Sequence, residues 1–207
     1  MKPKDLKFPH SWEERRPCLM EGILFVPKHF EHEMWTGPSF TGNIEFCSGN
    51  GEWIISKASQ HPEVQWIAVE MDFHRARKIY SKRMNLGLNN LLVVCGMAQP
   101  FVQYYLQEGS IDRIYINFPD PWPKARHAKH RIVQAPFTAE MKRILKKEGT
   151  ATLVTDDPTY HEQMKEEMGR YFIQKPWEGE DYGTSWFERL WREKGREIHY
   201  LRYTHGA

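Results

Sequence analysis

The segment between Ile116 and Arg131 holds the residues with the clearest potential for chemistry. It reads Ile-Asn-Phe-Pro-Asp-Pro-Trp-Pro-Lys-Ala-Arg-His-Ala-Lys-His-Arg. Pro119 and Pro121 remove backbone donors on both sides of Asp120, so this carboxylate is predicted to lie on a stiff loop outside any helix or sheet ladder. A carboxylate on a rigid loop at the end of a strand is more often a placed functional group than a structural accident.

Cations and an aromatic ring follow this carboxylate at once, and together they suit a nucleic acid. The residues able to neutralise phosphates are Lys124, Arg126, Lys129 and Arg131. Trp122 offers a face on which a displaced base can stack while its backbone is held. The alternative, an ordinary solvated basic loop, explains Trp122 and Asp120 less well. His127 and His130 have i, i+3 spacing without a third ligand nearby, so no metal site is predicted.

A regular scaffold that could position this loop begins near Asn43. Apolar runs predict strands over 44–47, 64–70, 91–95, 111–117 and 150–155, and the segments between them predict helices over 52–60, 73–86, 98–107 and 138–147. Strand, helix and strand repeated in this way imply a parallel sheet with helices on both sides, so the fold class is α/β. A helix over 156–169 and strands over 171–175 and 197–204, forming an antiparallel edge, complete the prediction.

The N-terminal segment does not share this alternation. Residues 1–35 have weak periodicity and many charges, so an N-terminal arm or an added helix, partly flexible, is expected there, followed by one domain over 36–207. The net charge of +2 provides no global attraction for nucleic acid, so any attraction must be local. No apolar run approaches the length of a membrane helix. Three cysteines without CxxC spacing favour free thiols in a reducing cytoplasm.

A glycine pair after the first predicted strand indicates a ligand-binding turn. Gly49 and Gly51 allow a tight turn and a close approach to a ligand, although the full dinucleotide fingerprint is absent because Cys47 and Ile54 replace its other glycines. Glu70 ends the second predicted strand, where an acid can accept both hydroxyls of a ribose. The alternatives for Glu70 are a solvated acid or a cap for the following helix.

The charges around the glycine pair distinguish two possible cofactors. A nicotinamide dinucleotide carries a pyrophosphate, which binds at helix N-termini that lack acids. Glu52 and Glu45 flank the glycine pair here, and they would repel a pyrophosphate but attract a sulfonium and an amino group. S-adenosyl-L-methionine is therefore the preferred cofactor, and a nicotinamide dehydrogenase is disfavoured.

Further polar residues are expected at the same edge of the sheet. Asp156 follows the strand over 150–155, and it could cap the next helix, contact a ligand, or do both. Because parallel strands present their carboxyl ends on one edge, Asp156, Asp120, Glu70 and Glu45 are expected on one rim. The aromatic residues over 183–191 are explained by an amphipathic helix, whereas Ser185 and Glu188 could reach the rim; the sequence leaves this open.

Taken in order, these residues resemble the bacterial tRNA (guanine-N7-)-methyltransferases from about Asn43 to the C-terminus. The resemblance implies a class I methyltransferase fold, a Rossmann-like three-layer sandwich with a mostly parallel seven-stranded sheet, together with S-adenosyl-L-methionine as methyl donor. It implies a guanine of the tRNA variable loop as acceptor, in a protein expected to be a monomer or homodimer. An amino-methyltransferase is disfavoured because the adjacent Pro-Pro of such enzymes is missing after the strand over 111–117.

The resemblance also implies roles for individual residues. The active-site residue would be Asp120, touching both donor and base. The residues expected to bind the donor are Glu45, Gly49, Gly51, Glu70, Met97 and Asp120. Those expected to contact the acceptor are Lys124, Asp156, Ser185 and Glu188, with Arg126, Lys129 and Arg131 on the tRNA backbone.

Two positions depart from the pattern of that family. Members usually have glycine where Cys47 stands, and a side chain there could narrow the donor pocket. They usually have Asp where Met97 stands, and a thioether cannot accept strongly from an adenine amino group, although it can pack on the adenine face. The alternative function is therefore a tRNA-binding protein of the same fold with impaired donor binding.

Overall fold

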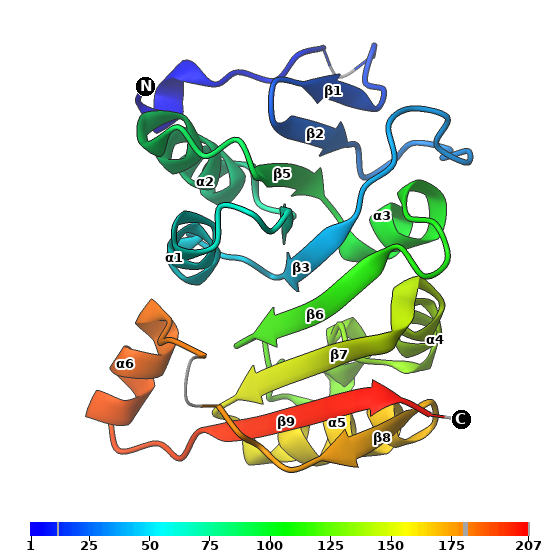
Figure 1. The fold of residues 1–207 in the computed structure, drawn as a ribbon, viewed down its shortest axis with the longest axis vertical. Helices are drawn as coiled ribbons and strands as arrows, with labels where there is room; N and C mark the ends of the chain where they lie inside the picture. The colour runs from blue at the N-terminus through cyan, green and yellow to red at the C-terminus, as the bar shows by residue number, and fades with distance from the viewer. Residues whose placement is uncertain (12, 180–181, 207) are drawn as a thin grey trace. The chain divides into compact units, whose positions relative to one another are not determined.

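The computed structural model describes residues 1–11, 13–179 and 182–206, and it divides into two compact units, Met1–Leu106 and Gln107–Ala207. Both units combine strands with helices, which confirms the predicted α/β class (Figure 1). None of the helices in the described part of the chain is long and apolar enough to cross a membrane.

The first unit is built on a mostly parallel group of strands. Its elements are η1 (Pro3–Asp5), β1 (Cys18–Met20), β2 (Ile23–Val26), β3 (Gly42–Phe46), α1 (Glu52–Gln60), β4 (Trp66–Glu70), α2 (Phe73–Leu86), β5 (Leu91–Gly96) and α3 (Ala98–Tyr105). The strands lie in the order β1-β2-β5-β4-β3, with only β1 antiparallel to its neighbour. Helices α1 and α2 pack on β4, and α2 also packs on β5.

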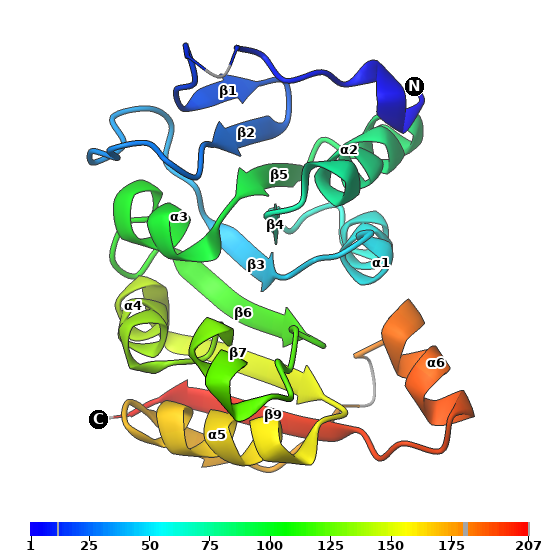
Figure 2. The same cartoon turned by 180° about the vertical axis from the view of Figure 1, so that it is seen from behind.

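The second unit carries the antiparallel edge. Its elements are β6 (Ile111–Asn117), η2 (Ala125–His130), α4 (Ala135–Ile144), β7 (Leu145–Thr155), α5 (Pro158–Gly169), β8 (Phe172–Lys175), α6 (Trp186–Glu193) and β9 (His199–His205). Strand β6 is parallel to β7, and β9 lies antiparallel between β7 and β8. Helix α5 covers one face of these strands, as the two opposite views show, and α6 lies beyond the carboxyl ends of β6 and β7 (Figures 1 and 2).

Local signals explain why α2 forms where the sequence predicted it. The carboxylate of Asp72 accepts the backbone N–H of Arg75 at 2.9 Å, which satisfies one of the unpaired donors of the first turn. Gly87 ends the helix in the left-handed conformation at φ 65°. Ala76 and Ile79 on its inner face are fully buried.

The strand content differs from the sequence prediction. The described residues form nine strands rather than seven. Two of them, β1 and β2, lie in the segment for which an arm or an added helix was expected. Strand β2 is only four residues long, too short for a periodic pattern, yet all its residues are buried and it pairs with β5 from Ile23 opposite Val93. Tertiary pairing, rather than local sequence, stabilises this strand.

One helix-to-strand boundary was also predicted wrongly. A helix was expected to continue to residue 147, but α4 ends at Ile144 and β7 begins at Leu145. The residues directly after Leu145 are charged, so the local sequence signals neither the end of a helix nor the start of a strand. Leu145 is 2% exposed and pairs with Ile111 of β6, so its burial in the sheet determines where the strand starts.

Candidate active site

Glu70 ends β4 and directs its carboxylate to the glycine loop, which we define as residues 47–51. Its Oε2 accepts the backbone N–H of Gly49 at 2.8 Å, and its Oε1 accepts that of Asp72 at 2.9 Å. Glu70 is 5% exposed, and burial raises the pKa of its carboxyl although the two backbone donors lower it. Each carboxylate oxygen has a second acceptor position. Asp72, and not Glu70, caps α2 through its side chain, so the capping alternative is wrong.

The glycine loop turns through left-handed backbone at several positions. Cys47, Gly49 and Gly51 have φ of 60°, 57° and 72°. A Cβ added to Gly51 would lie 2.7 Å from Cγ1 of Ile79 in α2, so packing between helices excludes a side chain there. Cys47 adopts the same region with a side chain present, which is strained for a residue of its type. The conformation gives a physical reason why glycine suits this position.

The other residues expected on the donor side come from neighbouring strands. Glu45 lies in β3 and is 2% exposed, and Met97 directly follows β5 and is 36% exposed. Strands β3, β4 and β5 are adjacent and parallel, with Glu70 opposite Cys95 in the register. Glu45, Glu70 and Met97 therefore lie at or near the carboxyl ends of three adjacent strands, the edge at which parallel sheets bind ligands.

In the second unit, Asp120 lies on a strained loop after β6, here called the Asp120 loop (residues 118–122). Phe118 and Trp122 have φ of 48° and 42°, a conformation that side chains rarely adopt. Pro119 is buried between them, whereas Asp120 is exposed. The N–H of Phe118 donates to the carbonyl of Val154 in β7 at 2.8 Å, which anchors the start of the loop. Backbone strain of this kind is retained mainly at functional sites.

Arg131 supports the Asp120 loop from inside the unit. It is 6% exposed, its Nε donates to the carbonyl of Pro121 at 2.7 Å, and its Nη1 donates to Gln163 at 2.6 Å. Its guanidinium lies 4.8 Å from the ring centroid of Tyr160 in α5. The structure therefore separates Arg131 from the other three cations expected to contact tRNA.

Those three cations remain on the surface around one aromatic group. Lys124 precedes η2, and Arg126 and Lys129 lie within it; all three are exposed. The ring of Trp122 is 5.9 Å from that of His127 and 5.2 Å from that of His130. Within the described ranges, no group of three or more histidines, cysteines and acids could hold a metal ion.

Two neighbouring acids after β7 have different partners. Asp157, rather than Asp156, caps α5 by accepting the N–H of Tyr160 at 2.7 Å, so the capping alternative for Asp156 is wrong by one residue. Asp156 instead forms an ion pair with Arg196. Asp156 and Asp120 follow the ends of two adjacent parallel strands, β7 and β6.

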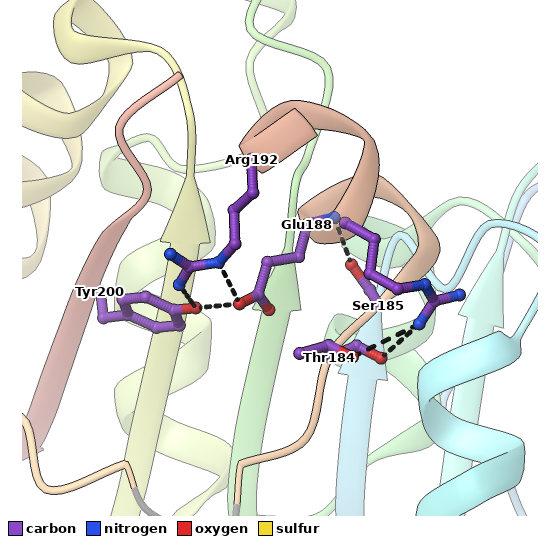
Figure 3. A network of polar contacts seen from close by, with 6 residues as sticks. Thr184, Ser185, Glu188, Arg192 and Tyr200 are labelled. Atoms are coloured by element: carbon purple, nitrogen blue, oxygen red, sulfur yellow. Dashed lines mark hydrogen bonds and ion pairs between the residues drawn. The ribbon is translucent and has the colours of Figure 1, made fainter. Parts of the chain in front are cut away.

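Ser185 and Glu188 open helix α6, where a helix was one of the expected alternatives. Ser185 Oγ accepts the N–H of Glu188 at 3.1 Å and caps the helix. Glu188 is 3% exposed, and its Oε1 accepts the hydroxyl of Tyr200 at 2.5 Å and Nε of Arg192 at 3.0 Å (Figure 3). No other hydrogen bond to its carboxylate comes from the described residues, so Oε2 keeps its acceptor capacity.

Sequence reasoning missed the residues that hold Glu188. Arg192 Nη2 also donates to the Tyr200 hydroxyl at 3.1 Å, which closes a triangle of polar contacts (Figure 3). Burial, followed by the hydrogen bond to Glu188, raises the pKa of Tyr200 to about 12. The i, i+4 spacing of Glu188 and Arg192 is a signal that could have identified one partner. Tyr200 comes from β9 and could not have been identified locally.

Comparisons with known proteins identify methyltransferases as relatives of this chain. Residues 41–201 match a family model described as "Putative methyltransferase". The chain is 48% identical over 217 residues to the tRNA (guanine-N(7)-)-methyltransferase of Chlamydia felis (strain Fe/C-56), covering 98% of this chain and 97% of the relative.

Solved structures share the fold at low sequence identity. The 16S rRNA methyltransferase KamB aligns with a TM-score of 0.57 at 17% identity, over 82% of this chain and 89% of that chain. Phosphoethanolamine N-methyltransferase 2 of Haemonchus contortus, solved with S-adenosyl-L-methionine, aligns with a TM-score of 0.55 at 12% identity, over 83% of this chain and 50% of that chain. These likenesses confirm the class I methyltransferase fold.

Proposed function

Because this chain belongs to the tRNA (guanine-N(7)-)-methyltransferase family, we propose that it transfers a methyl group from S-adenosyl-L-methionine to N7 of a guanine in the variable loop of tRNA. The observation that carries the proposal is the Asp120 loop, in which strained backbone at Phe118 and Trp122 brackets an exposed carboxylate. The proposed enzyme acts in the cytoplasm, as a monomer or homodimer.

The residues of the first unit fit the methyl donor. Glu70 is a buried carboxylate already oriented by Gly49 and Asp72, with acceptor positions left for two ribose hydroxyls. Glu45, a second acid, precedes the glycine loop by two residues. Met97 offers an apolar surface to the adenine of the donor. When bound, S-adenosyl-L-methionine supplies a methyl group on a positively charged sulfur. No pyrophosphate-binding helix start is needed for such a ligand.

Asp120 is assigned to the acceptor base. Guanine N7 has a lone pair and no proton, so the transfer needs no general base, and the protein contributes placement and electrostatics. Asp120 accepts from N1–H and N2–H of the guanine, which fixes the base and stabilises the positive charge that develops on it. Adenine lacks this pair of donors and is rejected.

The remaining acceptor residues divide into contacting and supporting groups. Lys124, Arg126 and Lys129 are exposed beside Trp122, and we assign them to tRNA phosphates. Arg131 is buried against Pro121, so we assign it to support of the loop instead of tRNA contact. Glu188 Oε2, which keeps its acceptor capacity, is assigned to hydrogen bonds from N–H or O–H groups of the nucleotide that is methylated. Asp156, paired with Arg196, and the capping Ser185 shape the same surface.

The proposal is tested by mass spectrometry of unmodified tRNA after incubation with the protein and isotopically labelled donor. We expect one labelled methyl group on a guanine of the variable loop, at N7. A transcript with adenosine at that position serves as the control and should acquire no label. Labelling of both transcripts, or of an exocyclic amine, would contradict the proposal.

The rival function, a tRNA-binding protein with impaired donor binding, has its own signature. It rests on the side chains at Cys47 and Met97. Calorimetry with S-adenosyl-L-methionine should give a saturable heat for the enzyme. A protein that binds tRNA but gives no heat with the donor would be the rival.

A further inference from the structure

Helix α2 in the first unit is unusually basic, and the proposed chemistry assigns no ligand contact to its cations. Its sequence, Phe73–Leu86, contains three arginines, two lysines and one histidine and no acid. Arg83 is buried and donates to the carbonyl of Leu91 at 2.7 Å, so it has a structural role. Arg77 lies over the ring of Phe73, 5.7 Å from its centroid. The remaining cations are on the outer side.

Three of these outer cations form a line along the helix, which we call the α2 stripe: Arg75, Lys78 and Lys82. Their i, i+3 and i+7 spacing places them on one face. Arg75 and Lys78 are exposed and Lys82 is half-buried. At 1.5 Å of rise per residue the α2 stripe is about 10 Å long, a length that suits neighbouring phosphates of one strand more than a single small anion.

The cations of the α2 stripe act electrostatically on acids nearby, Arg75 on Glu70 and Lys82 on Glu52, but within the part of the chain that the structure describes they lack the direct ion pairs that cations of α5 form. In α5 and directly after it, Lys165 pairs with Glu162 at 3.2 Å and Arg170 pairs with Glu166 at 3.2 Å. No ion pair joins Arg75, Lys78 or Lys82 to any residue in the described ranges. Their like charges repel one another at these spacings. An external anion would relieve that repulsion.

Two of the cations are held in place beside the glycine loop. Lys82 Nζ donates to the carbonyl of Asn50 at 2.7 Å, and Lys78 Nζ donates to its Oδ1 at 3.3 Å. Burial, opposed in part by the charge of Glu52 and assisted by that of Lys78, lowers the pKa of Lys82. Ammonium groups fixed in this way lose less side-chain freedom when they bind an anion.

We propose that the α2 stripe is a second tRNA-binding surface, which binds phosphates of the tRNA backbone. The proposal rests on the proposed function, because it takes tRNA as the partner. With a net charge of only +2, the protein has to attract a polyanion through local clusters. The α2 stripe is such a cluster, formed by residues of the first unit alone.

The test compares two double variants of equal charge. Arg75→Gln/Lys78→Gln removes two cations that have no acidic partner in an ion pair, whereas Lys165→Gln/Arg170→Gln removes two paired cations in α5 and directly after it. Binding of unmodified tRNA is measured without methyl donor as a function of salt concentration. We expect the first variant to reduce the slope of log K against log salt by about 2, one for each phosphate that the variant no longer neutralises, and the control to match the wild type.

Several results would overturn the proposal. Equal slopes for both double variants would remove the α2 stripe from tRNA binding. A reduced slope accompanied by the absence of heat with S-adenosyl-L-methionine would assign the α2 stripe to support of the glycine loop. Binding to vesicles containing phosphatidylserine that depends on the same two cations, without any effect on tRNA, would assign it to a membrane surface. The tRNA-binding measurement contains no methyl donor, so its outcome does not depend on methyl transfer. Failure of the proposed function would appear in the mass spectrometry experiment instead.

Discussion

The carboxylate of Glu70 accepts the backbone N–H of Gly49 at 2.8 Å across 21 residues of sequence. This bond joins the end of β4 to the glycine loop that follows β3. Its partner bond to the N–H of Asp72 fixes the other oxygen at 2.9 Å. The acid proposed to bind the donor is therefore oriented before the donor arrives, which reduces the entropic cost of binding.

Replacement of Glu70 by Gln is expected to weaken donor binding about 10–100-fold, since hydrogen bonds to charged groups contribute about 1.5–3 kcal/mol. The amide NH2 would also face the N–H of Gly49 or Asp72. Calorimetry with S-adenosyl-L-methionine measures the change. The matched control is Glu63→Gln, an exposed acid in the same unit, which should bind like the wild type. Unchanged affinity in the Glu70 variant would remove Glu70 from the donor site.

The raised pKa of Glu70 predicts two opposite pH effects. Donor affinity requires the ionised carboxylate, so it should fall as the pH drops through the raised pKa, beginning above the usual 4.5. Stability follows the other sign, because a buried charge is costly. The free energy of unfolding of the wild type is compared with that of Glu70→Gln. The difference in favour of the wild type should be largest below pH 4.5 and should decrease as the pH rises through the folded-state pKa. Calorimetry and thermal melts of both proteins between pH 4 and 7 check the two slopes; parallel curves would contradict this account.

Replacement of Asp120 by Asn should reduce kcat by about 10²–10³-fold, the typical cost of losing one electrostatic contact to the transition state. Affinity for the donor should stay close to that of the wild type, because the binding carboxylate of Glu70 is untouched. Asp112→Asn is the control and should keep normal turnover, because Asp112 is a half-exposed acid of β6, the strand before the Asp120 loop, and it pairs with Lys146. Normal rates in the Asp120 variant would refute its role.

Replacement of Cys47 by Gly should stabilise the protein. Left-handed backbone costs a residue with a Cβ about 1–2 kcal/mol, and the greater freedom of glycine in the unfolded chain offsets part of the gain. A net gain of ~1 kcal/mol would raise Tm by roughly 2–4 °C. Cys47→Ala keeps the Cβ and the φ of 60°, so it should show no gain in thermal melts. Equal melting temperatures for the two variants would exclude backbone strain as the cause.

Two tyrosines of β9 provide a matched pair of variants. The hydroxyl of Tyr200 donates to Glu188 at 2.5 Å, whereas the buried hydroxyl of Tyr203 has no hydrogen-bond partner among the described residues. Tyr200→Phe should raise KM for tRNA and cost about 1–3 kcal/mol of stability, because the buried Oε1 of Glu188 loses one of its two donors. Tyr203→Phe should be neutral or stabilising. Steady-state kinetics with tRNA and denaturant melts test both; equal effects would show that Tyr200 only fills space.

Much of the scaffold could be predicted because its signals are local. Helix α2 has a capping acid and a terminal glycine at its two ends, and β6 has a buried apolar run over 114–116 directly before the polar turn that follows it. Strands β1 and β2 could not be predicted, since four apolar residues in a charged segment become a strand only when β5 is beside them. The charged start of β7 was missed for the same reason.

The candidate site was predictable by residue type more than by environment. Asp120 and Glu70 could be selected because strand ends and turns mark functional positions. Arg131 looked like its neighbouring cations, and only the fold, through Pro121 and Tyr160, distinguishes it. The strain at Phe118 and Trp122 was also invisible, because backbone conformation there depends on tertiary contacts.

The left-handed backbone at Phe118 and Trp122 has a consequence for engineering. A search for heat-resistant variants would favour glycine at these positions, as at Cys47, since it removes the steric penalty. At Cys47 glycine would restore the residue that the family usually has, but beside Asp120 a more flexible backbone would allow the carboxylate to adopt several orientations. Selection for thermal stability alone would therefore reduce catalytic activity through substitutions in this loop, while the fold stayed intact.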